Sequence, residues 1–262
     1  MTLARIINAI EGIAPLKAAA PWDLSGLQVA SVRTSVRALA VCLDPTPDSI
    51  RAALDQGAQC ILSHHPLCLK PTLPNRLDAY HEALRLLFQA DVPLYAAHTS
   101  LDVNPQGPAG WPGRELGLNE VSVLEPVGEG SAFAHLGYGL AGNLPQPQTL
   151  AQILSTLGRH APFSALTVSG KTPEAISRVA YCAGSGSSLL EAAQRAGAQL
   201  FITGDVKYHT ALATDICLCD VGHHSLEEEM MRRMSLLLQE ELAGIDVFFV
   251  PSVSPFRPVV LP

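Results

Sequence analysis

The segment Ile61-Leu62-Ser63-His64-His65-Pro66-Leu67 is an apolar run that ends in two adjacent histidines followed by a proline. Pro66 has no backbone donor, so it ends the element that precedes it. Neighbouring side chains on an extended backbone point to opposite sides, so one metal ion rarely binds both imidazoles unless the strand ends in a turn. Two ions could take one histidine each. Because a histidine at a strand end is usually a packed or surface residue, the interpretation depends on partners elsewhere in the chain.

The composition is that of a well-folded protein. The 262 residues are 48% hydrophobic and 16% charged, which excludes disorder and is enough for one large or two smaller α/β domains. The formal net charge is −7 and no run of Lys or Arg occurs, so nucleic acid is not an expected partner. No apolar segment reaches the roughly 20 residues that cross a bilayer, and the N-terminus fits an amphipathic helix. We therefore expect a cytoplasmic protein with no membrane partner.

Apolar runs and helical patterns alternate in the first half of the chain. Strands are predicted at 36–43, 59–63 and 92–97, with helices at 48–56 and 79–90 between them. This order favours a mainly parallel sheet with crossover helices, in which ligands gather at the carboxyl ends of the strands. The residues that follow these strands, and are expected at one edge of the sheet, are Asp44, His64, His65, His98 and Asp102.

The alternation of strands and helices resumes after a stretch rich in Pro and Gly at 104–113. Further strands and helices up to residue 214 predict a second α/β domain that is inserted into the first. We place the metal-binding domain at 1–125 and 215–262, and the inserted domain at 126–214. The expected fold class is α/β, with two domains and mainly parallel sheets.

The C-terminal third supplies further candidate ligands. A strand predicted at 216–221 leads into Gly222-His223-His224-Ser225-Leu226-Glu227 at the start of a helix. His223 and Glu227 are four residues apart, so they share one helix face and can reach a common ion. Taken alone, such a pair is more often a surface pair that binds no metal. With His64, His65 and Asp102 they give three imidazoles and two carboxylates. That is more than one tetrahedral ion needs, so two ions are the economical interpretation.

Two divalent ions held roughly 3.5 to 4 Å apart repel each other, and a bridging carboxylate offsets this repulsion. We expect Glu227 as the bridge, with His64 and Asp102 at one ion and His65 and His223 at the other. This arrangement leaves open positions on both metals, as a hydrolytic site requires. Mixed imidazole and carboxylate ligands suit Zn, Fe, Mn, Co or Ni, so the identity of the two divalent cations stays open.

Four motifs carry a resemblance that covers nearly the whole chain: SHHPL at 63–67, HTSLD at 98–102, GDVKYH at 204–209 and GHxSxE at 222–227. Together with the segment from Trp22 to Val29 and the Gly184-Ser185-Gly186 loop, they resemble the Nif-three-like family. This family is also described as dinuclear metal centre proteins of the YbgI type and as GTP cyclohydrolase I type 2. Departures are modest, since Leu24 stands where the family has Asn and Ala30 where it has Gly, and neither puts the expected metal ligands in doubt.

The resemblance implies two α/β domains per subunit with a dimetal site in the cleft between them. It further implies a toroidal homo-hexamer whose sites face the interior, and it supports the ligand assignment with Glu227 shared between the ions. The longer members of the family carry an extra inserted domain, for which this chain is too short.

The residues around the expected ligands have less certain roles. Glu227 and His98 are the catalytic candidates, and His98 could orient Asp102, bind as a third nitrogen ligand or simply pack. The free amides of the loop at 184–188 could hold a phosphate, but a tight strand-to-helix turn explains that motif equally well. Lys207 and His209 could contact an anion or donate a proton, although a helix cap with surface residues gives the same pattern. The substrate-binding candidates are Asp44, Asp205, Lys207, Tyr208 and His209.

Our first hypothesis is a dinuclear metal-dependent hydrolase in which a metal-activated hydroxide attacks a nucleotide or related small-molecule substrate. The family description implies ring-opening hydrolysis of GTP, and a phosphoester is about as plausible on chemistry alone. The alternative is a non-catalytic metal-binding protein, either a metallochaperone or a regulatory scaffold. A DNA-binding ring fits the family's shape but does not fit the acidic charge.

Overall fold

The computed structural model describes residues 1–128, 133, 135–163 and 166–257, which form two compact units. The first unit consists of Met1–Leu101 and Met230–Val253, and the second of Asp102–Glu229 with the described residues from Ser254 onward. The chain passes between the units inside two helices, α4 (Thr99–Asp102) and α9 (His223–Glu241), and again after Val253. The sequence-based division differs here, because it assigns 102–125, 215–229 and the residues after 253 to the first domain.

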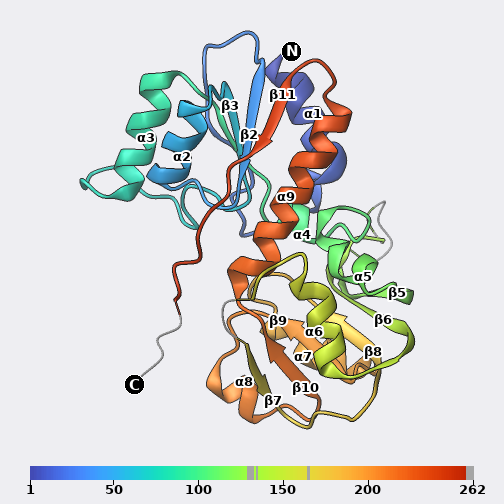
Figure 1. The fold of residues 1–262 in the computed structure, drawn as a ribbon. Helices are drawn as coiled ribbons and strands as arrows, with labels where there is room; N and C mark the ends of the chain where they lie inside the picture. The colour runs from blue at the N-terminus through green and yellow to red at the C-terminus, as the bar shows by residue number, and fades with distance from the viewer. Residues whose placement is uncertain (129–132, 134, 164–165, 258–262) are drawn as a thin grey trace. The chain divides into compact units, whose positions relative to one another are not determined.

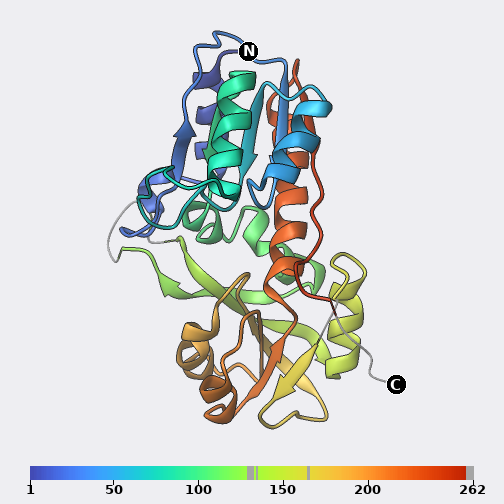
Figure 2. The same cartoon turned by 90° about the vertical axis from the view of Figure 1, so that its left-hand side faces the viewer.

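The first unit contains a five-stranded sheet in the order β1-β4-β3-β2-β11 (Figure 1). Strands β4, β3, β2 and β11 are parallel to their neighbours, while β1 runs antiparallel to β4. Helices α2 and α3 cover one face of the sheet, and Figure 2 shows α1 behind it on the opposite face. The bounds are β1 (Gly26–Val29), β2 (Ala38–Cys42), β3 (Cys60–Ser63), β4 (Leu94–Ala96), β11 (Asp246–Phe249), α1 (Leu3–Ile13), η1 (Leu16–Ala18), α2 (Pro47–Asp55) and α3 (Ala79–Ala90).

The residues of β2 alternate between the two faces of this sheet. Ala40 and Cys42 belong to one buried cluster together with Ile50 of α2 and Leu87 of α3. Leu39 and Val41 are also fully buried, and strand geometry directs them to the other face. Burial on both faces explains why the parallel strands read as continuous apolar runs in the sequence.

Helices of the first unit begin where a short polar side chain can cap them. Thr2 accepts a hydrogen bond from the Arg5 amide at the start of α1, and Thr46 accepts one from the Ser49 amide at the start of α2. Asp78 caps α3 in the same way. Each cap satisfies an amide that the helix itself leaves without a partner, so the helix starts follow from the sequence.

The second unit contains a six-stranded mixed sheet in the order β5-β6-β8-β9-β10-β7. Strands β8, β9 and β10 are parallel, and the remaining three pairings are antiparallel. Helix α7 packs on this sheet, where Leu190 and Ala193 meet Ala180 and Phe201. The bounds are η2 (Pro108–Gly110), α5 (Trp111–Glu115), β5 (Asn119–Pro126), β6 (Gly137–Gln148), α6 (Leu150–Gly158), β7 (Thr167–Ser169), β8 (Ile176–Tyr181), η3 (Ser187–Leu189), α7 (Leu190–Arg195), β9 (Leu200–Thr203), α8 (Tyr208–Leu212) and β10 (Cys217–Asp220).

The predicted α/β class with two sheets and mostly parallel strands is confirmed, since five of the nine pairings among the described strands are parallel. The antiparallel pairings are concentrated in the second unit. There β5 and β6 are long neighbouring strands, in the region where the sequence predicts strands and turns without a helix. Among the described residues, no helix combines the length and the apolar character needed to span a membrane.

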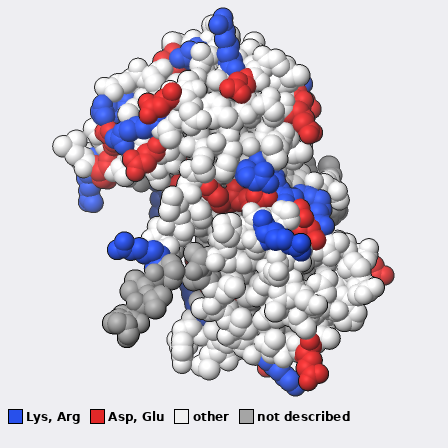
Figure 3. All heavy atoms as spheres, in the orientation of Figure 1, with Lys and Arg blue, Asp and Glu red and all other residues white. Residues whose placement is uncertain are grey.

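Charged side chains of both signs are interspersed over α2 and α3, at the upper left of Figure 3. Arg51 pairs with Asp48 and with Glu82, and Glu82 also pairs with Arg85. These pairs hold the pKa of Glu82 below its usual range, chiefly through the hydrogen bond from Arg85. Exposed pairs of this kind contribute little stability, and their mixed signs give α2 and α3 no single-signed surface that could attract a polyanion.

Two neighbouring residues of α3 test this description of the first unit. Leu87 is fully buried and Phe88 is 64% exposed. We expect Leu87→Ala to lower the free energy of unfolding by about 2–5 kcal/mol, because it leaves a cavity, and Phe88→Ala to change it by about 0.5 kcal/mol or less. Urea unfolding followed by circular dichroism measures both values. Equal losses in the two variants would contradict the described packing of α3.

Candidate metal centre

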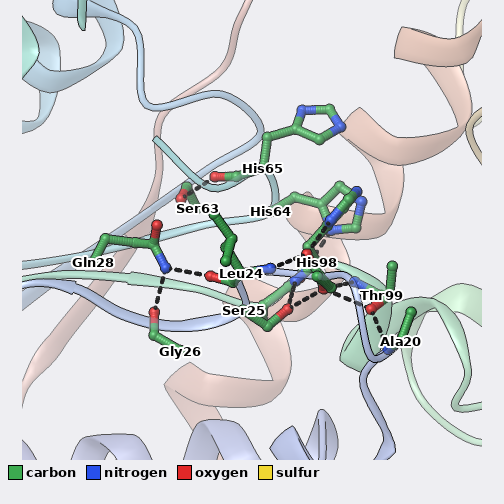
Figure 4. A network of polar contacts seen from close by, with 12 residues as sticks. Ala20, Leu24, Ser25, Gly26, Gln28, Ser63, His64, His65, His98 and Thr99 are labelled. Carbon is green, nitrogen blue, oxygen red and sulfur yellow. Dashed lines mark hydrogen bonds and ion pairs between the residues drawn. The ribbon is translucent and has the colours of Figure 1, made fainter. Parts of the chain in front are cut away.

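Three histidines of the first unit lie together at the carboxyl ends of two parallel strands (Figure 4). His64 and His65 follow β3, and His98 follows β4. Their ring centroids are 4.9 Å apart for His64 and His65, 5.2 Å for His64 and His98, and 5.4 Å for His65 and His98. One nitrogen of each ring lies within 4.8 Å of the other two, so the group could hold a metal ion.

In all three imidazoles, the Nδ1 atom is engaged by an oxygen. His64 Nδ1 lies 2.9 Å from the Ala97 carbonyl, His65 Nδ1 lies 2.7 Å from Asp44 Oδ1, and His98 Nδ1 lies 2.8 Å from Asp23 Oδ1. A carbonyl or carboxylate oxygen only accepts, so each Nδ1 carries the proton. In a neutral ring this assigns the lone pair to Nε2, which is the arrangement that orients a metal-binding histidine.

The backbone after β3 explains why two adjacent histidines share one side. The amide of His64 donates to the carbonyls of Cys42 and Leu43, and the amide of His65 also donates to Leu43. The Ser63 hydroxyl then donates to the His65 carbonyl at 2.7 Å. The strand therefore ends in a turn at the histidine pair, and this is the condition under which neighbouring imidazoles can converge.

Asp23, from the loop before β1, is the most heavily hydrogen-bonded carboxylate beside these histidines. Besides His98, it accepts from the Leu24 amide at 2.7 Å, the Ser25 hydroxyl at 2.6 Å, and the amide and hydroxyl of Thr99 at 3.1 and 2.5 Å. Burial alone would raise its pKa, but the hydrogen bonds from His98, Ser25 and Thr99 hold the pKa of Asp23 well below its usual range. Asp23 thus stays ionised and fixes the ring of His98.

Sequence reasoning did not single out Asp23 as a site residue. The only available signal was its place in the turn-rich segment that contributes to the family resemblance. The contact with Asp23 also bears on His98, because it engages Nδ1 and leaves Nε2 as the nitrogen that can act as a ligand. Of the alternatives for His98, this geometry favours a third nitrogen beside His64 and His65.

The second unit contributes an acidic and imidazole cluster at the start of α9. His223 Nδ1 lies 2.7 Å from Asp205 Oδ2, and His223 Nε2 lies 2.8 Å from Glu227 Oε2. An oxygen of Asp102 and an oxygen of Glu227 lie within 4.8 Å of each other. Glu227 is buried, at 3% exposure. The spacing of four residues brings His223 and Glu227 together, as the sequence predicts.

The two carboxylates change the ionisation of His223. Burial of the ring opposes its charge, but the hydrogen bonds and charges of Glu227 and Asp205 outweigh this and raise the pKa of His223 to about 9. At neutral pH the imidazolium therefore lies between two anions. A divalent cation bound at Nε2 would replace that proton, because a metal ligand must be deprotonated.

A left-handed glycine gives Glu227 its space. Gly184 has a φ of +62°, and a Cβ there would overlap Glu227 Oε1 and lie 3.4 Å from His223 Nε2. The surrounding loop is held by hydrogen bonds from the Gly186 amide to the Thr203 hydroxyl and from the Gly204 amide to the Gly184 carbonyl, both 2.9 Å. With the Gly186 amide engaged in this way, the geometry favours the tight strand-to-helix turn over a phosphate loop.

The remaining predicted residues fall into two groups. Asp44 and Asp205 each accept a hydrogen bond from the Nδ1 of a histidine, so their carboxylates position His65 and His223. Lys207, Tyr208 and His209 are exposed at the start of α8, where the rings of Tyr208 and His209 meet edge to face with centroids 5.4 Å apart. Contact of any of these residues with a substrate stays a prediction.

Comparisons with known proteins agree over nearly the full length of the chain. A family model described as Duf34/NIF3 (NGG1p interacting factor 3) matches residues 1–255. A protein of Streptococcus pneumoniae serotype 4 named "GTP cyclohydrolase 1 type 2 homolog" is 27% identical over 268 residues and covers 98% of both chains. One of the same name from Nostoc sp. is 31% identical over 216 residues, which are 80% of this chain and 79% of the relative. The crystal structure of a Bacillus cereus protein related to NIF3 shares the fold, with a TM-score of 0.86, 21% identity, and coverage of 99% of this chain and 98% of that one.

The hydrogen-bond network of Asp23 predicts a stability that depends on pH. We expect Asp23→Asn to cost about 1–3 kcal/mol near pH 7, because it leaves donors of His98 and Thr99 poorly matched. The pKa of Asp23 is lowered on folding, so its stabilisation is present above the unfolded value of about 3.8 and is lost as the pH falls below it. Urea midpoints of wild type and variant should therefore converge in acid. Asp48→Asn, whose side chain is 97% exposed, is the control, and a stability gap that is constant from neutral to acid pH would refute the assignment.

The close approach of Gly184 to Glu227 predicts a steric effect. Gly184→Ala should displace the Glu227 carboxylate and reduce the affinity for divalent metal by about tenfold or more, the range seen when residues around a metal site change. Gly197→Ala is the matched control, because Gly197 is also left-handed, with φ +75°, but its nearest neighbour would lie 3.9 Å from the new Cβ. Calorimetric titration with Zn²⁺ or Mn²⁺ measures the metal affinity of both variants. Similar affinities would contradict the steric effect and would show that backbone strain alone accounts for any loss.

Proposed function

Because this chain belongs to the Duf34/NIF3 (NGG1p interacting factor 3) family, we propose that it is a metal-dependent hydrolase of a nucleotide or a related small molecule. The observation that carries this proposal is the fixing of Nδ1 in His64, His65 and His98 by oxygen acceptors, which leaves three Nε2 atoms as donors. The name "GTP cyclohydrolase 1 type 2 homolog" of its relatives supports a nucleotide as the substrate.

The donor set fits two divalent cations. We assign His64 and Asp102 to one ion, His65 and His223 to the other, and Glu227 to both as the bridge. His98 supplies a further imidazole beside His64 and His65. Three to four imidazoles with two carboxylates are borderline ligands that suit Zn, Fe, Mn, Co or Ni, and the ions' positive charge compensates for the burial of Glu227.

The residues of the chain have distinct tasks in this proposal. Asp44 and the Ala97 carbonyl fix the rings of His65 and His64, and Asp205 does the same for His223, so that all three present Nε2. Glu227 lies in the first turn of α9, which positions its carboxylate. Gly184 has no side chain, and this leaves the space that the carboxylate occupies. Two bound divalent ions would supply the acidity that converts water to a nucleophile near neutral pH, and would stabilise negative charge that develops on the substrate.

A homo-hexameric assembly, which the family resemblance implies, and a cytoplasmic location, which the sequence predicts, belong to the same proposal. Size-exclusion chromatography with light scattering tests the assembly. A mass that corresponds to one or two chains at micromolar concentration would refute the hexamer.

Substitution of the proposed bridge tests the function directly. Wild type loaded with Mn²⁺, Zn²⁺, Fe²⁺ or Co²⁺ should turn over at least one nucleotide, and Glu227→Gln or His64→Ala should reduce kcat/KM by about 100-fold or more, because each removes a metal ligand. Glu228→Gln, one position further along α9, is the matched control and should retain activity. Chromatographic analysis of products across a nucleotide panel measures the rates.

Two outcomes would contradict the hydrolase. Turnover that survives both Glu227→Gln and His64→Ala would show that the activity comes from a contaminant. No turnover of any nucleotide, combined with reversible transfer of bound metal to an acceptor protein, would instead favour a metallochaperone.

A further inference from the structure

We propose that Trp22 is the platform on which the planar base of the substrate stacks beside the three histidines, so that the site selects molecules with a heteroaromatic ring. This inference rests on the proposed function and names a binding residue for it. Its evidence lies entirely within the first unit, in the exposure of Trp22, its contact with His98 and the way its backbone is held.

Trp22 differs sharply from the other tryptophan of the chain. Trp111 is fully buried and its indole nitrogen donates to the Leu226 carbonyl at 3.1 Å, so it serves the core of the second unit. Trp22 is 63% exposed, which leaves most of a large apolar ring in contact with solvent. Such a ring contributes little to folding, whereas an indole in that position offers a flat surface of high affinity for another ring.

The exposed indole lies at the histidine group. The ring centroids of Trp22 and His98 are 6.0 Å apart with an angle of 75° between their planes, an edge-to-face contact. His98 in turn contacts His64 and His65. Trp22 therefore extends the cluster of imidazoles by one ring, and a molecule stacked on it would lie next to the nitrogens assigned to the metal ions.

The backbone on both sides of Trp22 is fixed, although the side chain is exposed. Ala20 donates from its amide to the Thr99 hydroxyl at 2.9 Å, and the Asp23 amide donates to the Ala20 carbonyl at 2.9 Å. The Asp23 carboxylate then accepts hydrogen bonds from His98 and Thr99. This fixed backbone and the edge contact with His98 limit the positions of the ring before the ligand arrives, which reduces the entropy that binding must offset.

Stacking on tryptophan distinguishes classes of small molecules. Every nucleobase has a π face and can stack, so the interaction tolerates different bases but gives nothing to a sugar phosphate that lacks a base. An indole beside metal-binding imidazoles thus favours a nucleotide or another heteroaromatic compound over an aliphatic phosphoester. The ring of Trp22 provides this selection, while the metal ligands remain unchanged.

The chain contains two tryptophans, so fluorescence can report on Trp22. Metal-loaded protein is titrated with GTP and, separately, with ribose 5-phosphate, in wild type and in Trp22→Leu, Trp22→Phe and Val32→Ala. Val32 is 89% exposed in the same unit and is the control for a surface substitution. With excitation at a wavelength that tyrosine does not absorb, only the buried Trp111 emits in Trp22→Leu, so any remaining change in emission comes from the second unit.

We expect GTP, but not ribose 5-phosphate, to quench wild-type emission, and the quenching to disappear in Trp22→Leu. In the same variant KM for the nucleotide should rise by roughly ten- to a hundredfold, the range typical of a lost base stack, while kcat changes less than about threefold. Trp22→Phe should recover most of the affinity, and Val32→Ala should behave as wild type.

Absence of quenching by GTP in the wild type, or wild-type affinity for GTP in Trp22→Leu, would overturn the assignment. Emission that is already shielded from acrylamide without ligand, together with a changed oligomeric state of Trp22→Leu, would also overturn it and would show that a second copy of the chain covers the indole. Quenching by GTP without turnover would leave the stacking role intact and refute only the hydrolase.

Discussion

Hydrogen bonds from Nδ1 of the histidines to oxygen acceptors are the constraint on which the candidate centre depends. The acceptors are a backbone carbonyl for His64 and carboxylates for His65, His98 and His223. Each bond fixes both the orientation of the ring and the nitrogen that is left to bind a cation. A cluster of imidazoles without these oxygens would rotate and exchange protons between its nitrogens. The same chemistry recurs in both units, which supports a common role for their side chains.

The parallel sheet of the first unit makes this arrangement possible. Strands β2, β3 and β4 run side by side, so the residues that follow them meet at one edge. Asp44 follows β2, the histidine pair follows β3, and Ala97 and His98 follow β4. The imidazoles of His65 and His64 therefore bind acceptors, Asp44 and the Ala97 carbonyl, that come from the neighbouring strands. In the second unit, the turn after β9 carries Asp205 to His223 at the start of α9. The buried apolar strands thus end at the positions where the polar side chains of the candidate centre lie.

Much of the fold could be predicted from the sequence, because it rests on local patterns. The apolar runs that became β2, β3 and β4, and the capped helices between them, are visible without any contact information. The same holds for the four-residue spacing of His223 and Glu227. The role of Asp23 could not be predicted, since its contacts with His98 and Thr99 span about 75 residues of chain. The need for glycine at position 184 likewise arises only when Glu227 is brought against it by folding.

A crystal of the protein soaked in Mn²⁺, with diffraction data collected for anomalous scattering, tests the proposed dinuclear centre most directly. We predict two anomalous peaks, one bound by Nε2 of His64 and one by Nε2 of His65, with Glu227 bound to both. No peak at these residues, or a single ion bound through Nδ1 after its ring has turned away from Asp44 or Ala97, would contradict the proposal.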